Sequence, residues 1–231
     1  MILAGDIGGT RSRLLLYQPG EAEAQVERTL TSREHADFPS LLRAFLDKVQ
    51  ADRFGAIEAA AFGVAGPVRG EGREARVQAT NLPWTMSADE LSRVLGGASV
   101  HLANDLIAVG MGALSSPMDQ RVNLNPEADS GLGHVAIIAP GTGLGEAVFF
   151  HDGASYRPMP SEGGHCDFAP NDDREAALLT FLRGRFGGHV SYERILSGDG
   201  FSSLYAFARQ AGLGRPAADA DQRLAEASDA N

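Results

Sequence analysis

Two glycine-rich segments that each contain a threonine are the first candidates for chemistry in this sequence. They are Gly5-Asp6-Ile7-Gly8-Gly9-Thr10 and Pro140-Gly141-Thr142-Gly143-Leu144-Gly145. Glycines let a bulky anion approach backbone N–H groups, and the Asp6 carboxylate and Thr10 hydroxyl add polar atoms at the first turn. Taken alone, that turn is equally well explained as a plain β-hairpin with positive φ angles at Gly8 and Gly9. Two such segments together indicate two half-domains that face one phosphate chain.

An amide next to a carboxylate forms the second candidate. Asn104-Asp105 follows a short apolar run at residues 100–103 and precedes apolar residues at helical spacing. Because open α/β sheets place ligand-binding groups at the carboxyl ends of their strands, we expect Asp105 to face a cleft. The alternative is that Asp105 only caps the helix that follows it.

The third candidate is a loop that combines glycines with an acid and an imidazole, Ser161-Glu162-Gly163-Gly164-His165-Cys166-Asp167-Phe168. A flexible loop that presents Glu162 and His165 to a polar ligand explains this pattern best. A metal site made of Glu162, His165 and Asp167 is the weaker alternative, because the run is rich in glycine rather than helical.

The pattern of apolar residues around these segments predicts an α/β protein. Strands are expected on both sides of each glycine-rich turn and over residues 24–31, 57–64 and 100–103. Helices are expected over residues 39–50, 87–95, 106–114, 174–186, 198–212 and, weakly, 219–228. Asp37 is the expected N-cap of the first helix, and Ser87 with Glu90 forms a capping-box pattern at the second. We divide the chain into a domain at residues 1–109 and a larger, partial domain at residues 110–231.

Composition narrows the class of protein. The chain has 231 residues, 43% of them hydrophobic, with a formal net charge of −10 and a single lysine, Lys48. Without a basic stripe, nucleic acid is not expected as a partner. Cys166 is the only cysteine, which excludes a disulfide framework and a cysteine-based zinc site. No apolar stretch approaches about 18 residues and no leader pattern is visible, so we expect a cytoplasmic protein without a membrane partner.

These motifs, in this order, resemble those of the bacterial ATP-dependent glucokinases, a family of the actin-like sugar kinase and hexokinase superfamily. The resemblance rests on the segments quoted above together with Val190-Ser191-Tyr192-Glu193-Arg194-Ile195-Leu196-Ser197-Gly198, and it extends from about Ile2 to Tyr205. It implies the actin-like, ribonuclease H-like ATPase fold, with two α/β lobes around a cleft. A P-loop kinase is not expected, because the pattern Gly-x-x-x-x-Gly-Lys-Ser/Thr is absent from the sequence.

The resemblance also implies a reaction, in which ATP with Mg²⁺ phosphorylates the 6-hydroxyl of glucose. Asp105 would be the general base, and the residues that contact the sugar would be Asn104, Asp105, Glu162, His165 and Glu193. The phosphates would be wrapped by Gly5, Asp6, Ile7, Gly8, Gly9, Thr10, Gly141, Thr142 and Gly143. Asp6 would lie near the Mg²⁺ shell without being a direct metal ligand. Glucose and ATP are therefore the expected partners, and a homodimer is left open.

Length is where the chain departs from this family. Family members continue further, through a third glycine-rich loop that contacts adenosine, so we expect an incomplete second lobe with exposed apolar sheet faces and strand edges. A non-catalytic sugar-binding or regulatory protein is accordingly the alternative function. A phosphotransferase that acts on a carboxylate or polyphosphate is a weaker alternative, because the carboxylates of Asp105 and Glu162 would repel an anionic substrate.

Overall fold

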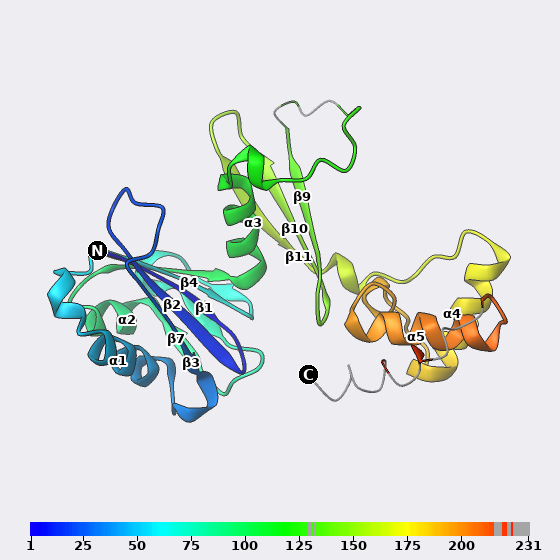
Figure 1. The fold of residues 1–231 in the computed structure, drawn as a ribbon, viewed down its shortest axis with the longest axis horizontal. Coiled ribbons are helices and arrows are strands. Elements are labelled where there is room, and N and C mark those ends of the chain that lie inside the picture. Colours follow the sequence, from blue (N-terminus) through cyan, green and yellow to red (C-terminus); the bar gives the residue numbers. More distant parts are fainter. Residues whose placement is uncertain (129–130, 132, 215–218, 221–222, 224–231) are drawn as a thin grey trace. The chain divides into compact units, whose positions relative to one another are not determined.

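The computed structural model describes residues 1–128, 131, 133–214, 219–220 and 223. Its internal contacts divide the chain into a first unit, Met1–Asp129, and a second unit, Ser130–Asn231 (Figure 1). The boundary expected between residues 109 and 110 falls inside helix α3 (Asp105–Ser115), and this helix stays with the first unit because it packs on strands of that unit. Most of the weak helix expected near 219–228 lies outside the described residues.

A five-stranded sheet organises the first unit, with the strand order β3-β2-β1-β4-β8. Its strands are β1 (Ile2–Ile7), β2 (Arg11–Tyr17), β3 (Val26–Thr31), β4 (Ala59–Val64) and β8 (Ser99–Asn104). The first three pair antiparallel, as consecutive hairpins do, whereas β1, β4 and β8 are parallel. Parallel strands end at the same edge of a sheet, so the ends of β1 and β8 lie on one side of the unit.

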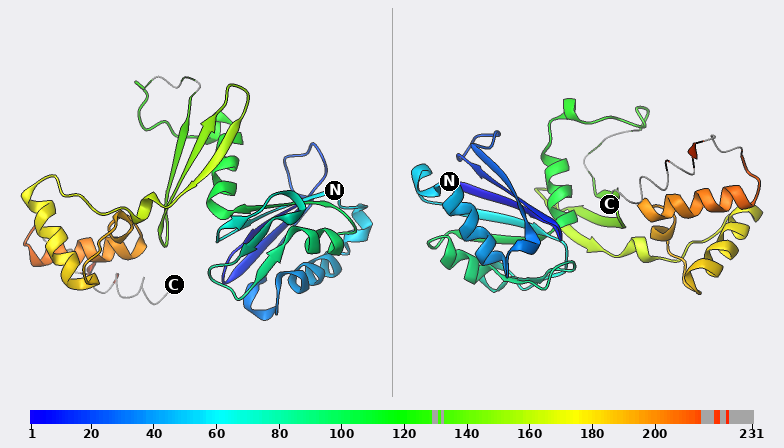
Figure 2. Two further views of the ribbon diagram at one scale, coloured as in Figure 1. Left: turned by 180° about the vertical axis from the view of Figure 1, so that it is seen from behind. Right: turned by 60° about the horizontal axis from the view of Figure 1, so that its bottom comes forward.

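Two helices cover one face of this sheet. Helix α1 (Phe38–Val49) and helix α2 (Ala88–Val94) lie side by side on it (Figure 1, Figure 2). Four fully buried side chains of α1, Phe38, Leu41, Leu42 and Phe45, form the centre of the core with strand residues such as Phe62. The rings of Phe38 and Phe62 meet edge to face at 5.0 Å, a favoured geometry for aromatic pairs.

The starts of these two helices test the capping predictions. The Asp37 carboxylate accepts a hydrogen bond from the Ser40 amide at 2.7 Å, and the Asp37 amide donates one to the Ser40 hydroxyl at 3.3 Å, so the expected N-cap of α1 is confirmed. The capping box expected at Ser87 is wrong, because the Ser87 side chain makes no cap hydrogen bond. Ser87 instead ends a strand and pairs with Arg76. That strand belongs to a small sheet made of β5 (Val68–Arg69), β6 (Arg76–Gln78) and β7 (Thr85–Ser87).

The second unit combines a three-stranded antiparallel sheet with two helices. The sheet has the order β11-β10-β9 and contains β9 (Val135–Pro140), β10 (Leu144–His151) and β11 (Tyr156–Ser161). Helices α4 (Asp173–Phe186) and α5 (Gly198–Gln210) form a separate small core around Leu182 and Phe207. Asp172 caps α4 by accepting from the Glu175 amide at 2.8 Å, and Gly187 ends it at a φ of 81°, which favours glycine.

The expectation of exposed apolar side chains on the second sheet is confirmed. Ile138, Val148, Phe150 and Met159 are all exposed. The strand register pairs Val148 with Met159 and Ile138 with Glu146, so these side chains project from one face of the sheet. Among the described residues, no helix is long and apolar enough to cross a membrane.

Candidate functional site

The first glycine-rich segment forms a tight turn between β1 and β2. The Gly8 amide donates to the Arg11 carbonyl at 3.0 Å and closes the turn. The positive φ angles expected at Gly8 and Gly9 are wrong, because neither residue is among those with positive φ. Both glycines are needed for space instead: a Cβ on Gly8 would lie 2.7 Å from the Arg11 carbonyl oxygen, and one on Gly9 would lie 2.6 Å from Asn81.

Two buried serines, Ser12 and Ser32, support this turn through hydrogen bonds. The Ser32 hydroxyl donates to the Gly8 carbonyl at 2.7 Å and lies 2.9 Å from the Ser12 hydroxyl, and both side chains are fully buried. The Ser32 amide also donates to the Thr10 carbonyl at 2.9 Å. Ser32 therefore fixes both arms of the turn. Sequence reasoning missed it, because nothing local in the sequence links Ser32 to a turn more than 20 residues earlier.

The strand register brings Asp6 and the Asn104-Asp105 pair to the same edge of the first sheet. Asp6 pairs with Gly63 on β4, and Gly63 pairs with Ala103 on β8. The Asp6 carboxylate is exposed and accepts no hydrogen bond from a described residue. Asp6 and Gly63 are neighbours in register, so their Cα–Cβ directions lie on the same face, and the first turn of α3 approaches this face at Gly63.

Asn104 is the residue that caps helix α3. Its Oδ1 accepts hydrogen bonds from the amides of Leu106 and Ile107, at 3.0 and 3.4 Å, and its Nδ2 donates to the Gly66 carbonyl at 3.3 Å. The alternative in which Asp105 is the N-cap is therefore wrong. Asp105 is the first residue of the helix and uses only Oδ1, which accepts from the Leu106 amide at 2.9 Å. Its Oδ2 receives no hydrogen bond from a described residue.

Gly63 is a second position that sequence reasoning missed. A Cβ placed on Gly63 would lie 3.0 Å from the Ala108 side chain and 3.7 Å from the Asp105 Cα. The missing side chain lets the first turn of α3 approach β4 closely, and this approach sets the position of Asp105. The glycine inside an otherwise apolar strand was the available signal, since such glycines mark close backbone approach.

The second glycine-rich segment also forms a turn, between β9 and β10. The Gly141 amide donates to the Gly143 carbonyl at 2.8 Å, and the Gly141 carbonyl accepts from the Gly198 amide, at the start of α5, at 2.9 Å. A Cβ on Gly141 would meet nothing within 4 Å, and its φ is not positive. Neither packing nor conformation within the described chain therefore requires glycine at position 141. Close approach of a ligand to this backbone would be a reason for glycine there.

Three of the residues expected to contact a sugar lie together in the second unit. His165 stands between two carboxylates: its Nε2 lies 3.7 Å from Glu162 Oε2, and its Nδ1 lies 3.8 Å from Glu193 Oε1. Glu162 is 90% exposed, whereas Glu193 is only 27% exposed. Asp167 instead pairs with His189 at 3.3 Å. No group of three described His, Cys, Asp or Glu residues is arranged to hold a metal ion.

Comparison with known proteins places these residues in a family. The sequence model of the Glucokinase family matches residues 3–230. The chain belongs to the glucokinase family. It is 32% identical to the glucokinase of Tolumonas auensis over 204 residues, and this matched region makes up 88% of this chain and 61% of that protein. It is 33% identical to the glucokinase of Klebsiella pneumoniae over 203 residues, which make up 88% of this chain and 60% of that protein. The chain thus spans about 60% of the length of these relatives.

Solved glucokinase structures confirm the actin-like α/β fold class. The crystal structure of glucokinase from an Antarctic psychrotroph matches with a TM-score of 0.78 and 28% identity, over 99% of this chain and 71% of that one. The glucokinase of Balamuthia mandrillaris, solved in complex with glucose, matches with a TM-score of 0.70 and 22% identity, over 91% and 63%.

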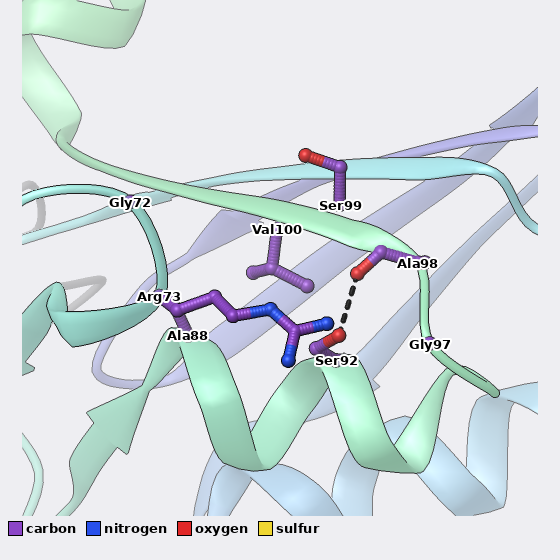
Figure 3. Close-up of a pocket in the computed structure, with 8 residues that line it drawn as sticks. All are labelled: Gly72, Arg73, Ala88, Ser92, Gly97, Ala98, Ser99 and Val100. Carbon is purple, nitrogen blue, oxygen red and sulfur yellow. Dashed lines mark hydrogen bonds between the residues drawn. The ribbon is translucent and has the colours of Figure 1, made fainter.

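A cavity of about 250 Å³ in the first unit lies apart from the residues of the glucokinase resemblance (Figure 3). It is bordered by Val100 near the start of β8, whereas Asn104 and Asp105 lie at the other end of that strand. Two of its polar side chains are already engaged: Ser92 donates to the Ala98 carbonyl at 2.7 Å, and Arg73 pairs with Asp89 at 3.8 Å. At this volume it is smaller than most ligand pockets, which hold about 300 Å³ or more.

Proposed function

We propose that this chain carries the sugar and phosphate sites of an ATP-dependent glucose kinase, which converts glucose and ATP to glucose 6-phosphate and ADP. The observation that carries the proposal is Asp105 at the end of a parallel strand, with one carboxylate oxygen unused within the described chain. Family membership over nearly the whole chain supports the same reaction.

In this proposal Asp105 is the general base. Phosphoryl transfer needs the attacking hydroxyl to be positioned and its proton to be accepted, and needs little covalent help from the protein. Asp105 Oδ2 would accept the proton of the sugar 6-hydroxyl as that oxygen attacks the γ-phosphate. Asn104 supports this role, because it caps α3 and so leaves the neighbouring carboxylate available.

The sugar is recognised by groups that can pair with its hydroxyls. Each hydroxyl is both a donor and an acceptor, and the carboxylates of Glu162 and Glu193, the His165 imidazole and the second N–H of the Asn104 amide supply complementary atoms. A sugar with one misplaced hydroxyl would leave some of these groups unpaired, and unpaired polar groups discriminate strongly between substrates.

Each of the two glycine turns has features that support a role in binding the phosphates of ATP. The turn at Gly8 and Gly9 is held rigidly by Ser32, and the turn at Gly141 leaves open space where a side chain would otherwise stand. Backbone N–H groups in such turns bind phosphate oxygens. Mg²⁺ bound with ATP would neutralise charge on the phosphates, and the exposed Asp6 carboxylate would lie near its hydration shell without being a direct ligand.

A coupled assay of ADP formation tests this proposal. The chain should form ADP only when glucose is present, and Asp105→Asn should lower turnover by about 10²-fold to 10⁴-fold, the usual contribution of a general base. Asp47→Asn, which changes an exposed carboxylate on α1, is the matched control and should behave as the wild type. Equal turnover in Asp105→Asn and wild type would refute the role of Asp105. Glucose binding without any ADP formation would instead identify a sugar-binding protein.

A further inference from the structure

The carboxylate of Glu193 faces two different loops of the second unit. Oε2 accepts a hydrogen bond from the Leu144 amide at 3.0 Å, and Oε1 lies 3.8 Å from His165 Nδ1. Leu144 directly follows the glycine turn at residues 141–143, and His165 belongs to the loop at residues 162–165. One side chain therefore touches both the turn proposed to bind phosphate and the loop proposed to bind sugar.

The packing around this carboxylate leaves it little freedom. A Cβ on Gly143 would lie 2.5 Å from Glu193 Oε2, so only glycine allows the carboxylate to approach the turn this closely. A Cβ on Gly164 would collide with the Leu144 carbonyl oxygen. The glycines of both loops are thus used to bring the turn, the sugar loop and Glu193 into direct contact.

Backbone hydrogen bonds fasten the segment that carries Glu193 to the same two loops. The Tyr192 amide donates to the Cys166 carbonyl at 3.1 Å, next to the sugar loop. The Gly198 amide donates to the Gly141 carbonyl at 2.9 Å, within the glycine turn. Glu193 lies between these two attachments, so its carboxylate is held from both sides.

We propose that Glu193 is a positioning residue that couples the sugar loop to the phosphate turn. The inference rests on the proposed function and adds a second role to a residue expected only to contact sugar. A sugar hydroxyl that engages Oε1 fixes the carboxylate, and the fixed Oε2 then holds the Leu144 N–H and the turn at residues 141–143. By thermodynamic linkage, a phosphate ligand that orders this turn must strengthen sugar binding by the same factor.

Amide hydrogen exchange at Leu144 measures this coupling directly in the chain as it exists. Glucose is the probe, added at a saturating concentration to the wild type, Glu193→Ala, Glu193→Gln and His165→Ala. Without glucose, exchange at Leu144 should be roughly tenfold or more faster in Glu193→Ala than in the wild type, because a hydrogen bond to a charged acceptor is lost. Glu193→Gln keeps an acceptor oxygen but loses the charge, so its exchange should lie between those of the wild type and Glu193→Ala. Exchange at Ala147, buried in β10, shows whether the sheet remains folded.

With glucose, exchange at Leu144 should slow further in the wild type and should not slow in Glu193→Ala. His165→Ala is the matched control, since it removes a neighbouring sugar contact but leaves the bond between Glu193 and Leu144 in place. If His165→Ala speeds exchange at Leu144 as much as Glu193→Ala does, the effect is general loosening and the coupling is refuted. If glucose protects residues 162–165 but not Leu144, the proposed function stands and the coupling fails. If glucose protects no residue of the wild type, the sugar-binding function itself fails.

Discussion

The hydroxyl of Ser32 donates a 2.7 Å hydrogen bond to the carbonyl of Gly8, at the turn proposed to bind phosphate. Ser32 lies 24 residues from Gly8 in the sequence and is completely buried. Its hydroxyl is also paired with that of Ser12 at 2.9 Å. The shape of the turn thus depends on a short buried hydroxyl chain beneath it, and this dependence can be tested.

Ser32→Ala should destabilise the first unit and weaken nucleotide binding. The substitution leaves the Gly8 carbonyl and the Ser12 hydroxyl without their buried partner, which costs about 1–3 kcal/mol of unfolding free energy. Chemical denaturation measures that loss, and calorimetry with magnesium ATP measures the affinity, which should fall more than the affinity for glucose. Thr29→Ala, at an exposed position of β3, is the control and should change neither the stability nor the ATP affinity by much. An unchanged ATP affinity in Ser32→Ala would show that the turn does not need this support.

Gly63→Ala should lower turnover by moving helix α3. The added methyl would stand 3.0 Å from the Ala108 side chain, so the first turn of α3 and Asp105 must shift, and overpacking of this kind costs about 1–3 kcal/mol. Gly112→Ala, within α3 itself, is the matched control, because a Cβ on Gly112 meets nothing within 4 Å. It should stabilise the protein by about 0.5–1 kcal/mol and leave turnover unchanged. Chemical denaturation measures the stability of both variants, and the ADP assay measures their turnover. Unchanged turnover in Gly63→Ala would show that its position does not set that of Asp105.

Asn104→Asp should separate the capping role of Asn104 from its proposed sugar role. Aspartate keeps the acceptor for the Leu106 and Ile107 amides, so the cap of α3 should be retained, and the lost bond from Nδ2 to the Gly66 carbonyl should cost only about 1–3 kcal/mol of stability. It loses the Nδ2 donor, so calorimetry should show weaker glucose binding. Asp172→Ala removes the N-cap of α4 and should cost about 1 kcal/mol of stability without affecting glucose affinity. Weaker glucose binding in both variants would mean that the loss follows from stability alone.

Asp152 should make the stability of the second unit depend on pH. Hydrogen bonds from the Ser155 and Ala154 amides and from the Arg157 side chain hold the pKa of the Asp152 carboxyl well below its ordinary value. A carboxyl with a lowered pKa stabilises the fold above its unfolded pKa, which is about 3.9, and this stabilisation is lost as the pH falls through the folded pKa.

Asp152→Asn should therefore lower the denaturation midpoint equally at pH 7 and pH 5, and the difference from wild type should shrink at pH 3. Arg157→Gln removes the ion pair but keeps both backbone hydrogen bonds, so its effect should be smaller. A difference between Asp152→Asn and wild type that stays constant from pH 7 to pH 3 would contradict this account.

Local signals in the sequence were sufficient for much of the first unit. Asp37 ahead of an amphipathic run predicted the start of α1, because an N-cap depends only on residues within one turn. The pattern at Ser87 failed for the opposite reason: pairing with Arg76 draws Ser87 into a strand, and a four-residue pattern does not contain that partner. The boundary at residues 109–110 differed from the observed units because α3 is held by packing against β4.

Adjacent residues were enough to predict the two glycine turns and the position of Asn104-Asp105 at a strand end, and the ordered set of motifs along the chain indicated the family. Three relationships emerge only in three dimensions: Ser32 supports Gly8, Gly63 lets α3 approach, and Glu193 reaches Leu144, 49 residues away in the sequence. Such contacts depend on strand register and on the space that packing leaves, which local propensities do not encode.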